Sequence, residues 1–201
     1  MFLINNCPVY EVSINSDNHK IFGISLVEEP AIETEFLALS KIEDKITLSF
    51  QDDKHIVSGI ALRANMPIYR IDDAGNGYYI LFTPDVIEKF MMRYAKDRNA
   101  FNVTVNHEFP VDNCYVVESY LINKERGICP IEFSDIEDGS WYVSMKIEND
   151  AVWNEIKNNK SLKGFSIEAF SEFKPIQEEL SKVEKSNGAL NYLNSIIKII
   201  K

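Results

Sequence analysis

The sequence is dominated by short segments in which apolar and polar residues alternate, separated by residues that favour turns. Alternation with a period of two is typical of strands with one buried face, and only two or three short helical patterns accompany it. The pattern therefore predicts a mainly β fold with peripheral α-helices, in the form of an antiparallel β barrel. The expected strands cover residues 9–14, 21–27, 46–50, 55–62, 68–71, 78–82, 101–105, 115–122, 141–147 and 163–173.

Turn and helix signals separate these strands. The run DDAGNG at residues 72–77 predicts a hairpin, because Gly and Asn tolerate a positive φ. Thr83 followed by Pro84 predicts the start of a helix that ends near Asn99 and covers the β core. Shorter helices are expected at residues 31–39 and after Asn149 or Asp150. The apolar stripe of the long helix consists of Val86, Ile87, Phe90, Met91, Tyr94 and Ala95.

The composition changes after Pro175. A charged helical segment is followed by Asn187 and Gly188, and then by apolar residues at helical spacing. We therefore expect a β domain over residues 1–175 and an amphipathic helical tail over residues 176–201, packed on the body or on a partner. The apolar positions of the tail are Leu190, Leu193, Ile196, Ile197 and Ile200.

Charge and cysteine content narrow the classes of partner. A net charge of −10 with scattered lysines and arginines argues against nucleic acid, which needs a clustered positive surface. The N-terminal segment lacks a basic region, and no run of about 18 apolar residues occurs, so we expect no membrane association. Cys7, Cys114 and Cys129 form no CxxC pair, which fits a reducing cytoplasm.

The stretch KGFSIEAFSEF at residues 163–173 carries the candidate nucleophile, Ser166. Alternation places its side chain on the face opposite Phe165 and Ile167, and Gly164 leaves the approach open. A serine needs a neighbouring base, and histidine, with an unperturbed pKa near 6.5, is suited to that role. Of the three histidines, His19 and His55 lie in polar contexts that predict solvent exposure, whereas His107 follows an apolar strand.

A third group would orient the base, and several carboxylates are candidates. If residues 101–105 and 115–122 form a hairpin that turns between Asp112 and Asn113, Glu118 lies opposite His107; a shift of one residue separates them. Glu168, on the same strand face as Ser166, and Glu108 are alternatives. From spacing alone, an ordinary strand serine is the favoured interpretation of Ser166, and a structural or surface role for His107 stays open.

Other nucleophile and metal motifs are incomplete. GFSIE lacks the second glycine of the GxSxG elbow, and strand residues continue where a helix should begin. The pair His107–Glu108 lacks the second histidine of HExxH. Cys114 could act as a thiol nucleophile beside His107, but it lies in an expected turn, and most lone cysteines are inert.

The order of several segments resembles a known family. ISLVEEPAIETEFLAL, MPIYRIDDAGNGYYILFTPDVIEKF, NHEF, VVESYLI, GSWYVSMKIENDAVWNEIK and GFSIEAF follow one another along the chain. In order and spacing they resemble the phage prohead (capsid maturation) serine proteases, relatives of the herpesvirus assemblins. The resemblance covers most of residues 9–173. It implies a β barrel wrapped by helices, with a histidine and a serine as the catalytic pair and a polar residue behind the histidine.

The resemblance assigns His107 as base and Ser166 as nucleophile, with Glu118 chosen as the third member. It implies a serine endopeptidase that needs no metal or cofactor and is autoproteolytic. The expected substrates are scaffold and major capsid proteins, and the expected location is the host cytoplasm, inside the assembling prohead; homodimerisation is left open. The alternative is a catalytically inactive capsid- or scaffold-binding module of the same fold.

One departure from the family predicts a rearranged chain order. Prohead proteases carry an EVSLVTxPA-like segment after the serine strand, whereas here ISLVEEPA precedes the histidine. This indicates a circular permutation in which residues 21–27 occupy the place of a C-terminal strand beside Ser166. Gly23 stands where that segment of the family supplies an acid, so an orienting carboxylate must come from elsewhere.

Overall fold

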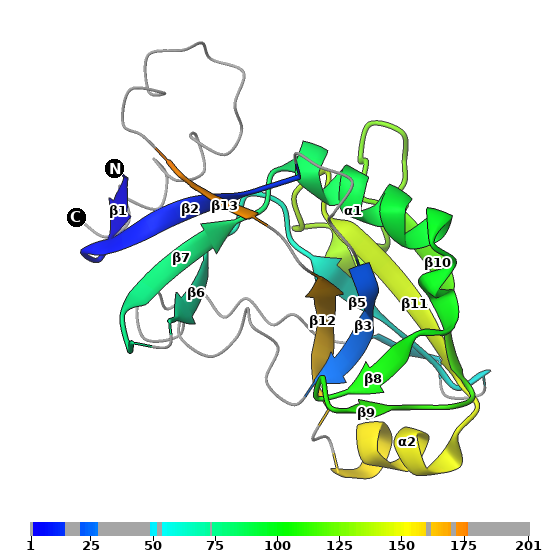
Figure 1. Cartoon of the computed structure of the whole chain (residues 1–201). Helices are drawn as coiled ribbons and strands as arrows, with labels where there is room; N and C mark the ends of the chain where they lie inside the picture. Colours follow the sequence, from blue (N-terminus) through cyan, green and yellow to red (C-terminus); the bar gives the residue numbers. More distant parts are fainter. Residues whose placement is uncertain are drawn as a thin grey trace.

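The computed structural model describes residues 2–14, 21–27, 49–51, 54–72, 74–159, 162–169 and 172–176. The helix expected at residues 31–39, and residues 177–201 of the expected tail, lie outside the described residues. Within them the chain is mainly β with few helices, as predicted (Figure 1). No helix in this part of the chain is long and apolar enough to cross a membrane.

Three separate sheets account for the strands. The first contains β1 (Leu3–Ile4), β2 (Cys7–Ser13), β7 (Gly77–Leu81) and β6 (Ile68–Ile71) in that order, and β13 (Glu172–Pro175) pairs with β2. The second runs β10 (Cys114–Leu121), β11 (Trp141–Ile147), β5 (Ile56–Leu62) and β4 (Ser49–Gln51). The third runs β12 (Gly164–Ala169), β3 (Ile21–Val27), β8 (Val103–Val105) and β9 (Phe109–Pro110).

The expected closed antiparallel barrel is not seen. The hydrogen-bonded ladders of the described strands end at sheet edges, and two of the pairs, β2 with β7 and β3 with β8, are parallel. The sheets instead share one apolar core, to which each contributes buried side chains. Among them are Val12 and Ile68 from the first sheet, Val57 and Trp141 from the second, and Leu26 and Phe165 from the third.

The hairpin and the long helix form as their sequences predict. In the β6–β7 hairpin, Ile71 pairs with Gly77, and the Asp72 carboxylate accepts hydrogen bonds from the backbone N–H groups of Ala74 and Asn76. Helix α1 (Pro84–Lys96) begins after Thr83, although the Thr83 side chain makes no capping bond. Its buried side chains are Val86, Ile87, Phe90 and Tyr94, four of the six predicted stripe positions. The helix contacts β3, β10 and β11.

The shorter helical elements follow local signals. Asn149 caps α2 (Asp150–Asn154), since its side chain accepts hydrogen bonds from the N–H groups of Ala151 and Val152. A π-helical turn, Glu155–Asn159, continues α2. Two 3-10 turns, Asn99–Phe101 and Ile131–Phe133, precede β8 and β11 respectively.

Segments from opposite ends of the chain lie side by side. Strand β3 pairs with β12 along its length, and β2 pairs with β13 (Figure 1). The proximity required by the permutation hypothesis, residues 21–27 beside the Ser166 strand, is therefore present. Of the N-terminal strands, β3 is an integral part of the sheet that carries Ser166, whereas β1 and β2 belong to the first sheet.

Candidate active site

Ser166 lies on β12, the edge strand of the third sheet. Its Cα partner across the ladder is Ser25 of β3, whose own partner on the other side is Thr104 of β8. Directly paired residues project from the same face of a sheet, so three hydroxyl side chains form a row across β12, β3 and β8. Phe165, on the opposite face, is buried in the core, as the alternation predicted. The half-buried Ser166 therefore faces away from the core.

His107 is placed over this row by a tight turn between β8 and β9. Asn106 and His107 have φ values of 51° and 61°, and the Glu108 N–H donates to the Val105 carbonyl at 3.1 Å. Two successive positive φ values are characteristic of a type I′ turn, and Asn and His adopt a positive φ more readily than most non-glycine residues. The His107 N–H also donates to the Ser25 hydroxyl at 3.0 Å. The fully buried Ser25 thus fixes the histidine backbone beside Ser166.

The imidazole of His107 faces a carboxylate from the serine strand. Its Nδ1 lies 3.3 Å from Oε1 of Glu168, and the same oxygen accepts a hydrogen bond from the Thr104 hydroxyl. The side chains of His107 and Glu168 are 43% and 22% exposed, so the pair lies at the surface with the carboxylate more enclosed. A carboxylate on Nδ1 orients an imidazole and leaves Nε2 available for chemistry.

The structure brings His107 and Glu168 together and places Ser166 on the adjoining positions. Glu168 follows Ser166 by two residues on the same strand face, and Ser25 adjoins Ser166 while binding His107. Within the described residues, the Ser166 hydroxyl makes no hydrogen bond to this imidazole. Nucleophile–base contacts are often long before substrate binds.

The hairpin that was expected to pair His107 with Glu118 does not form. Strand β8 pairs with β3 and β9, whereas β10, which carries Glu118, pairs with β11 in another sheet. The Glu118 carboxylate accepts a hydrogen bond from the Ser144 hydroxyl. The prediction of this pairing was wrong because the strand alternation of residues 115–122 is compatible with any neighbouring strand. Glu168, one of the alternative carboxylates, occupies the position beside the imidazole.

The remaining candidate nucleophile and bases have other environments. Burial raises the pKa of the Cys114 thiol to about 11, which keeps it protonated and poorly reactive. His55 is half-buried and stacks on Trp153 with ring centroids 4.6 Å apart, contrary to the solvent exposure that was predicted. His19 lies outside the described residues. Among the side chains that the structure describes, no group of three or more His, Cys, Asp or Glu residues is arranged to hold a metal ion.

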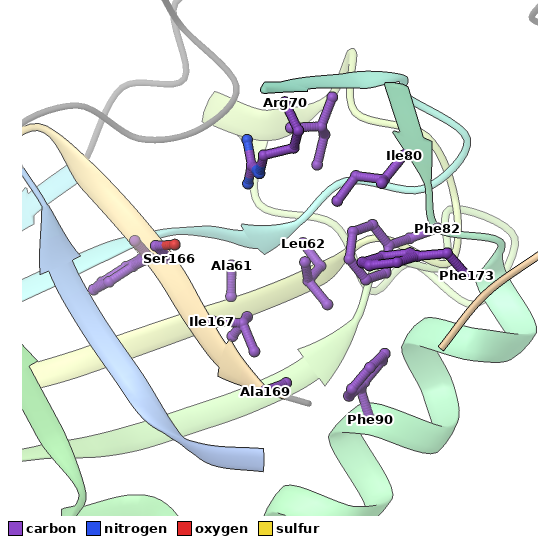
Figure 2. Close-up of a pocket in the computed structure, with 12 residues that line it drawn as sticks. Ala61, Leu62, Arg70, Ile80, Phe82, Phe90, Ser166, Ile167, Ala169 and Phe173 are labelled. Atoms are coloured by element: carbon purple, nitrogen blue, oxygen red, sulfur yellow. The ribbon is translucent and has the colours of Figure 1, made fainter. Parts of the chain in front are cut away.

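A cavity of about 190 Å³ adjoins Ser166 (Figure 2). Phe165, Ser166 and Ile167, which alternate between the two faces of β12, all line it, so the cavity lies along the edge of that strand rather than over one face. That edge is the one not paired with β3. Its polar lining side chains are Ser166 and Arg70; the apolar ones include Leu62, Ile68, Ile80, Phe82, Phe90 and Phe173.

Three contributors to this site were not identified from the sequence: Ser25, Thr104 and Arg70. Ser25 carried a signal, since it is a hydroxyl between Ile24 and Leu26 in an otherwise apolar strand. A buried hydroxyl in such a strand requires a hydrogen-bond partner, which here is the His107 backbone. Thr104 and Arg70 gave no comparable local signal, because their roles depend on strands distant in the sequence.

The fold and the site define a β-rich protein that carries a serine and a histidine–carboxylate pair on neighbouring strands. Residues 43–174 match the model of the family described as "Putative phage serine protease XkdF". The match covers more than half of the chain, so the chain belongs to this family of phage serine proteases, in agreement with the resemblance noted from the sequence. No curated protein and no solved structure matches the chain.

Proposed function

We propose that the protein is a serine endopeptidase in which Ser166 is the nucleophile, His107 the general base and Glu168 the carboxylate that orients the base. The observation that carries this proposal is the 3.3 Å approach of His107 Nδ1 to Glu168 Oε1, on the strand face that Ser166 shares. Glu168 replaces Glu118 in this role, because Glu118 is bonded to Ser144 in a different sheet.

The proposed reaction is acyl transfer. Nε2 of His107 removes the Ser166 proton as the hydroxyl oxygen attacks a peptide carbonyl, and the resulting imidazolium donates that proton to the departing amine. Water, deprotonated by the same imidazole, then hydrolyses the acyl ester and regenerates Ser166. The two groups adjoin the same residue, since the His107 N–H binds Ser25, the strand neighbour of Ser166. The proposal requires that the imidazole and the hydroxyl come into contact when substrate binds and excludes water.

Glu168 has two functions in this reaction. It holds the imidazole in the tautomer with hydrogen on Nδ1, and its negative charge stabilises the imidazolium formed during attack. The Thr104 hydroxyl donates to the same carboxylate oxygen, which restricts the carboxylate to one orientation. Thr104 and Ser25 are positioning residues, one for the acid and one for the histidine backbone.

The biological setting is part of the proposal, and membership of a phage serine protease family supports it. The natural substrates are scaffold and major capsid proteins in the assembling prohead, within the host cytoplasm, and the enzyme can process its own chain. Kinship with the herpesvirus assemblins belongs to the same proposal. The competing function is a capsid- or scaffold-binding module of the same family without hydrolytic activity.

Coexpression with the scaffold and capsid proteins of the same phage tests the proposal. We expect the wild-type protein to produce discrete fragments by intact mass analysis, and Ser166→Ala and His107→Ala to produce none. Ser134→Ala, at an exposed serine in a loop, is the matched control and should cleave as the wild type does. Complex formation without fragments in the wild type would support the binding module instead.

A further inference from the structure

We propose that the cavity beside Ser166 binds an acidic side chain of the substrate, next to the scissile bond, and that Arg70 is the residue that selects it. This inference rests on the proposed peptidase function, since it names the class of peptide that the same site cleaves. Three properties of the cavity carry it: its size, its position along β12, and the guanidinium in its wall.

The size of the cavity suits one side chain. Its volume of about 190 Å³ is below the roughly 300–1,000 Å³ of pockets that hold cofactors or drug-sized ligands. At about 30 Å³ per water molecule it has room for on the order of six waters. A single amino-acid side chain fills such a space, so a peptide rather than a small-molecule ligand is the matching occupant.

The position of the cavity suits an extended peptide. It lies along the edge of β12 that faces away from β3, where β5 packs against β12 and lines the cavity without pairing with that edge. A peptide that lies along an unpaired edge can pair through its backbone and send alternate side chains into flanking pockets. Because Ser166 is itself part of the cavity wall, the side chain that enters the cavity belongs to a residue adjoining the bond under attack.

Arg70 gives the cavity its charge preference. Its Nη1 donates to the Tyr69 carbonyl at 2.9 Å, and no carboxylate among the described residues pairs with it. In Figure 2 the guanidinium is directed to the side of the cavity on which Ser166 lies, whereas the rings of Phe82, Phe90 and Phe173 lie toward the other side. A guanidinium has five N–H donors, so most of its capacity is left for a ligand. A bidentate carboxylate matches that geometry.

The surroundings of Arg70 strengthen the preference. Burial lowers the pKa of the guanidinium from its ordinary value, which lies so far above neutrality that the group stays charged. A half-buried charge surrounded by apolar walls is stabilised by an anion and destabilised by a second cation. The net charge of the chain is −10, so long-range attraction does not favour an acidic peptide. Selection of a carboxylate must therefore come from direct contact with Arg70.

A binding experiment that does not depend on turnover tests the inference. The full-length Ser166→Ala variant is titrated with fluorescent, C-terminally amidated octapeptides of one sequence, with Glu, Gln, Leu or Lys at a single position that is moved along the peptide. We expect the best Glu peptide to bind about tenfold to a hundredfold more tightly than its Gln counterpart, the range for hydrogen bonds to a charged group. The Lys peptide should bind most weakly.

Two arginine variants, each made in the Ser166→Ala protein, distinguish a loss of carboxylate selection from a general loss of structure. Arg70→Gln should remove the Glu-over-Gln preference while leaving the affinity of the Leu peptide within about threefold. Arg93→Gln removes an arginine of α1 that pairs with Asp97, and the preference should persist. Equal affinities for Glu and Gln peptides, or a uniform loss of all affinities in Arg70→Gln, would overturn the inference.

Hydrolysis by the wild-type chain is measured in parallel with the same peptides. Cleavage beside Glu would support both proposals, and cleavage without preference for Glu would contradict only the role of Arg70. Preferential binding of Glu peptides with no hydrolysis of any peptide or coexpressed protein would contradict the peptidase function and leave the carboxylate site supported.

Discussion

At the scale of single residues, Glu168 and Glu118 form a natural comparison. Glu168 contacts the imidazole of His107, whereas Glu118 is bonded to Ser144 on another sheet. We expect Glu168→Gln to lower kcat/KM by about 10²–10⁴, because an amide at this position favours the wrong tautomer of the histidine. Glu118→Gln should change kcat/KM by less than about threefold and serves as the matched control. Similar losses in both variants, measured on one cleaved substrate, would exclude the assignment of Glu168.

The buried thiol of Cys114 gives a second residue-scale prediction. With a pKa near 11, on the order of one thiol per thousand is ionised at pH 8, and only the thiolate reacts. Alkylation by iodoacetamide should therefore be slow in the folded protein and should accelerate as the pH approaches 11. Cys114→Ala should retain activity. The unfolded protein, in which Cys114 should react fast, is the control for reagent and residue. Rapid modification of Cys114 at pH 8 in the folded protein, with loss of cleavage, would instead support Cys114 as the nucleophile.

At the scale of elements, the packing of β3 against the turn before β8 leaves no room for an added side-chain atom. A Cβ atom at Gly23 would overlap the backbone carbonyl of Asn102, which also accepts a hydrogen bond from the Ile24 N–H. Gly23→Ala should destabilise the protein by about 2 kcal/mol or more, since backbone cannot yield as a side chain does. Gly127 has a φ of 70° and open space around an added Cβ, so Gly127→Ala should lower the free energy of unfolding by only about 1 kcal/mol. Urea unfolding of both variants measures the difference.

The elements also show what the sequence could and could not predict. Residues 21–27, 68–71 and 141–147 form strands with the predicted bounds, and the turn at residues 72–77 forms a hairpin, because alternation and turn chemistry are local signals. Strand partners are not local. Nothing in residues 115–122 distinguishes β8 from β11 as a neighbour, so the placement of Glu118 depended on an assumed hairpin.

The same distinction explains the candidate site. Ser166 and His107 were candidates from their strand contexts, and the resemblance to the family assigned their roles. The carboxylate beside His107 depends on β12, β3 and β8 meeting in one sheet, a condition that involves three distant segments. Glu168 could be named as a candidate from its strand face, but only the order of the strands selects it. The prediction of a closed barrel was wrong for the same reason, since the register and partners of the strands, rather than their alternation, decide whether a sheet closes.

At the scale of the whole molecule, the N-terminal strand β3 completes the sheet that carries the candidate nucleophile. The family match begins at residue 43, yet β12 pairs with β3 and β13 pairs with β2. A chain that starts at residue 43 should therefore lack a cooperative unfolding transition and lose amide protection at residues 164–169. A chain that lacks only residues 2–6, and hence β1, is the control and should unfold cooperatively. Native-like protection of β12 in the shorter chain would show that β3 is dispensable.

The central claim is that Ser166 is an activated nucleophile that depends on His107. Labelling with a fluorophosphonate, followed by mass spectrometry of the modified peptide, measures this activation without knowledge of the substrate. We expect phosphonylation of Ser166 in the wild-type protein, none at this residue in His107→Ala, and a slower reaction in Glu168→Gln than in Glu118→Gln. An unlabelled Ser166 in the folded wild-type protein, or labelling at an equal rate without His107, would contradict the account.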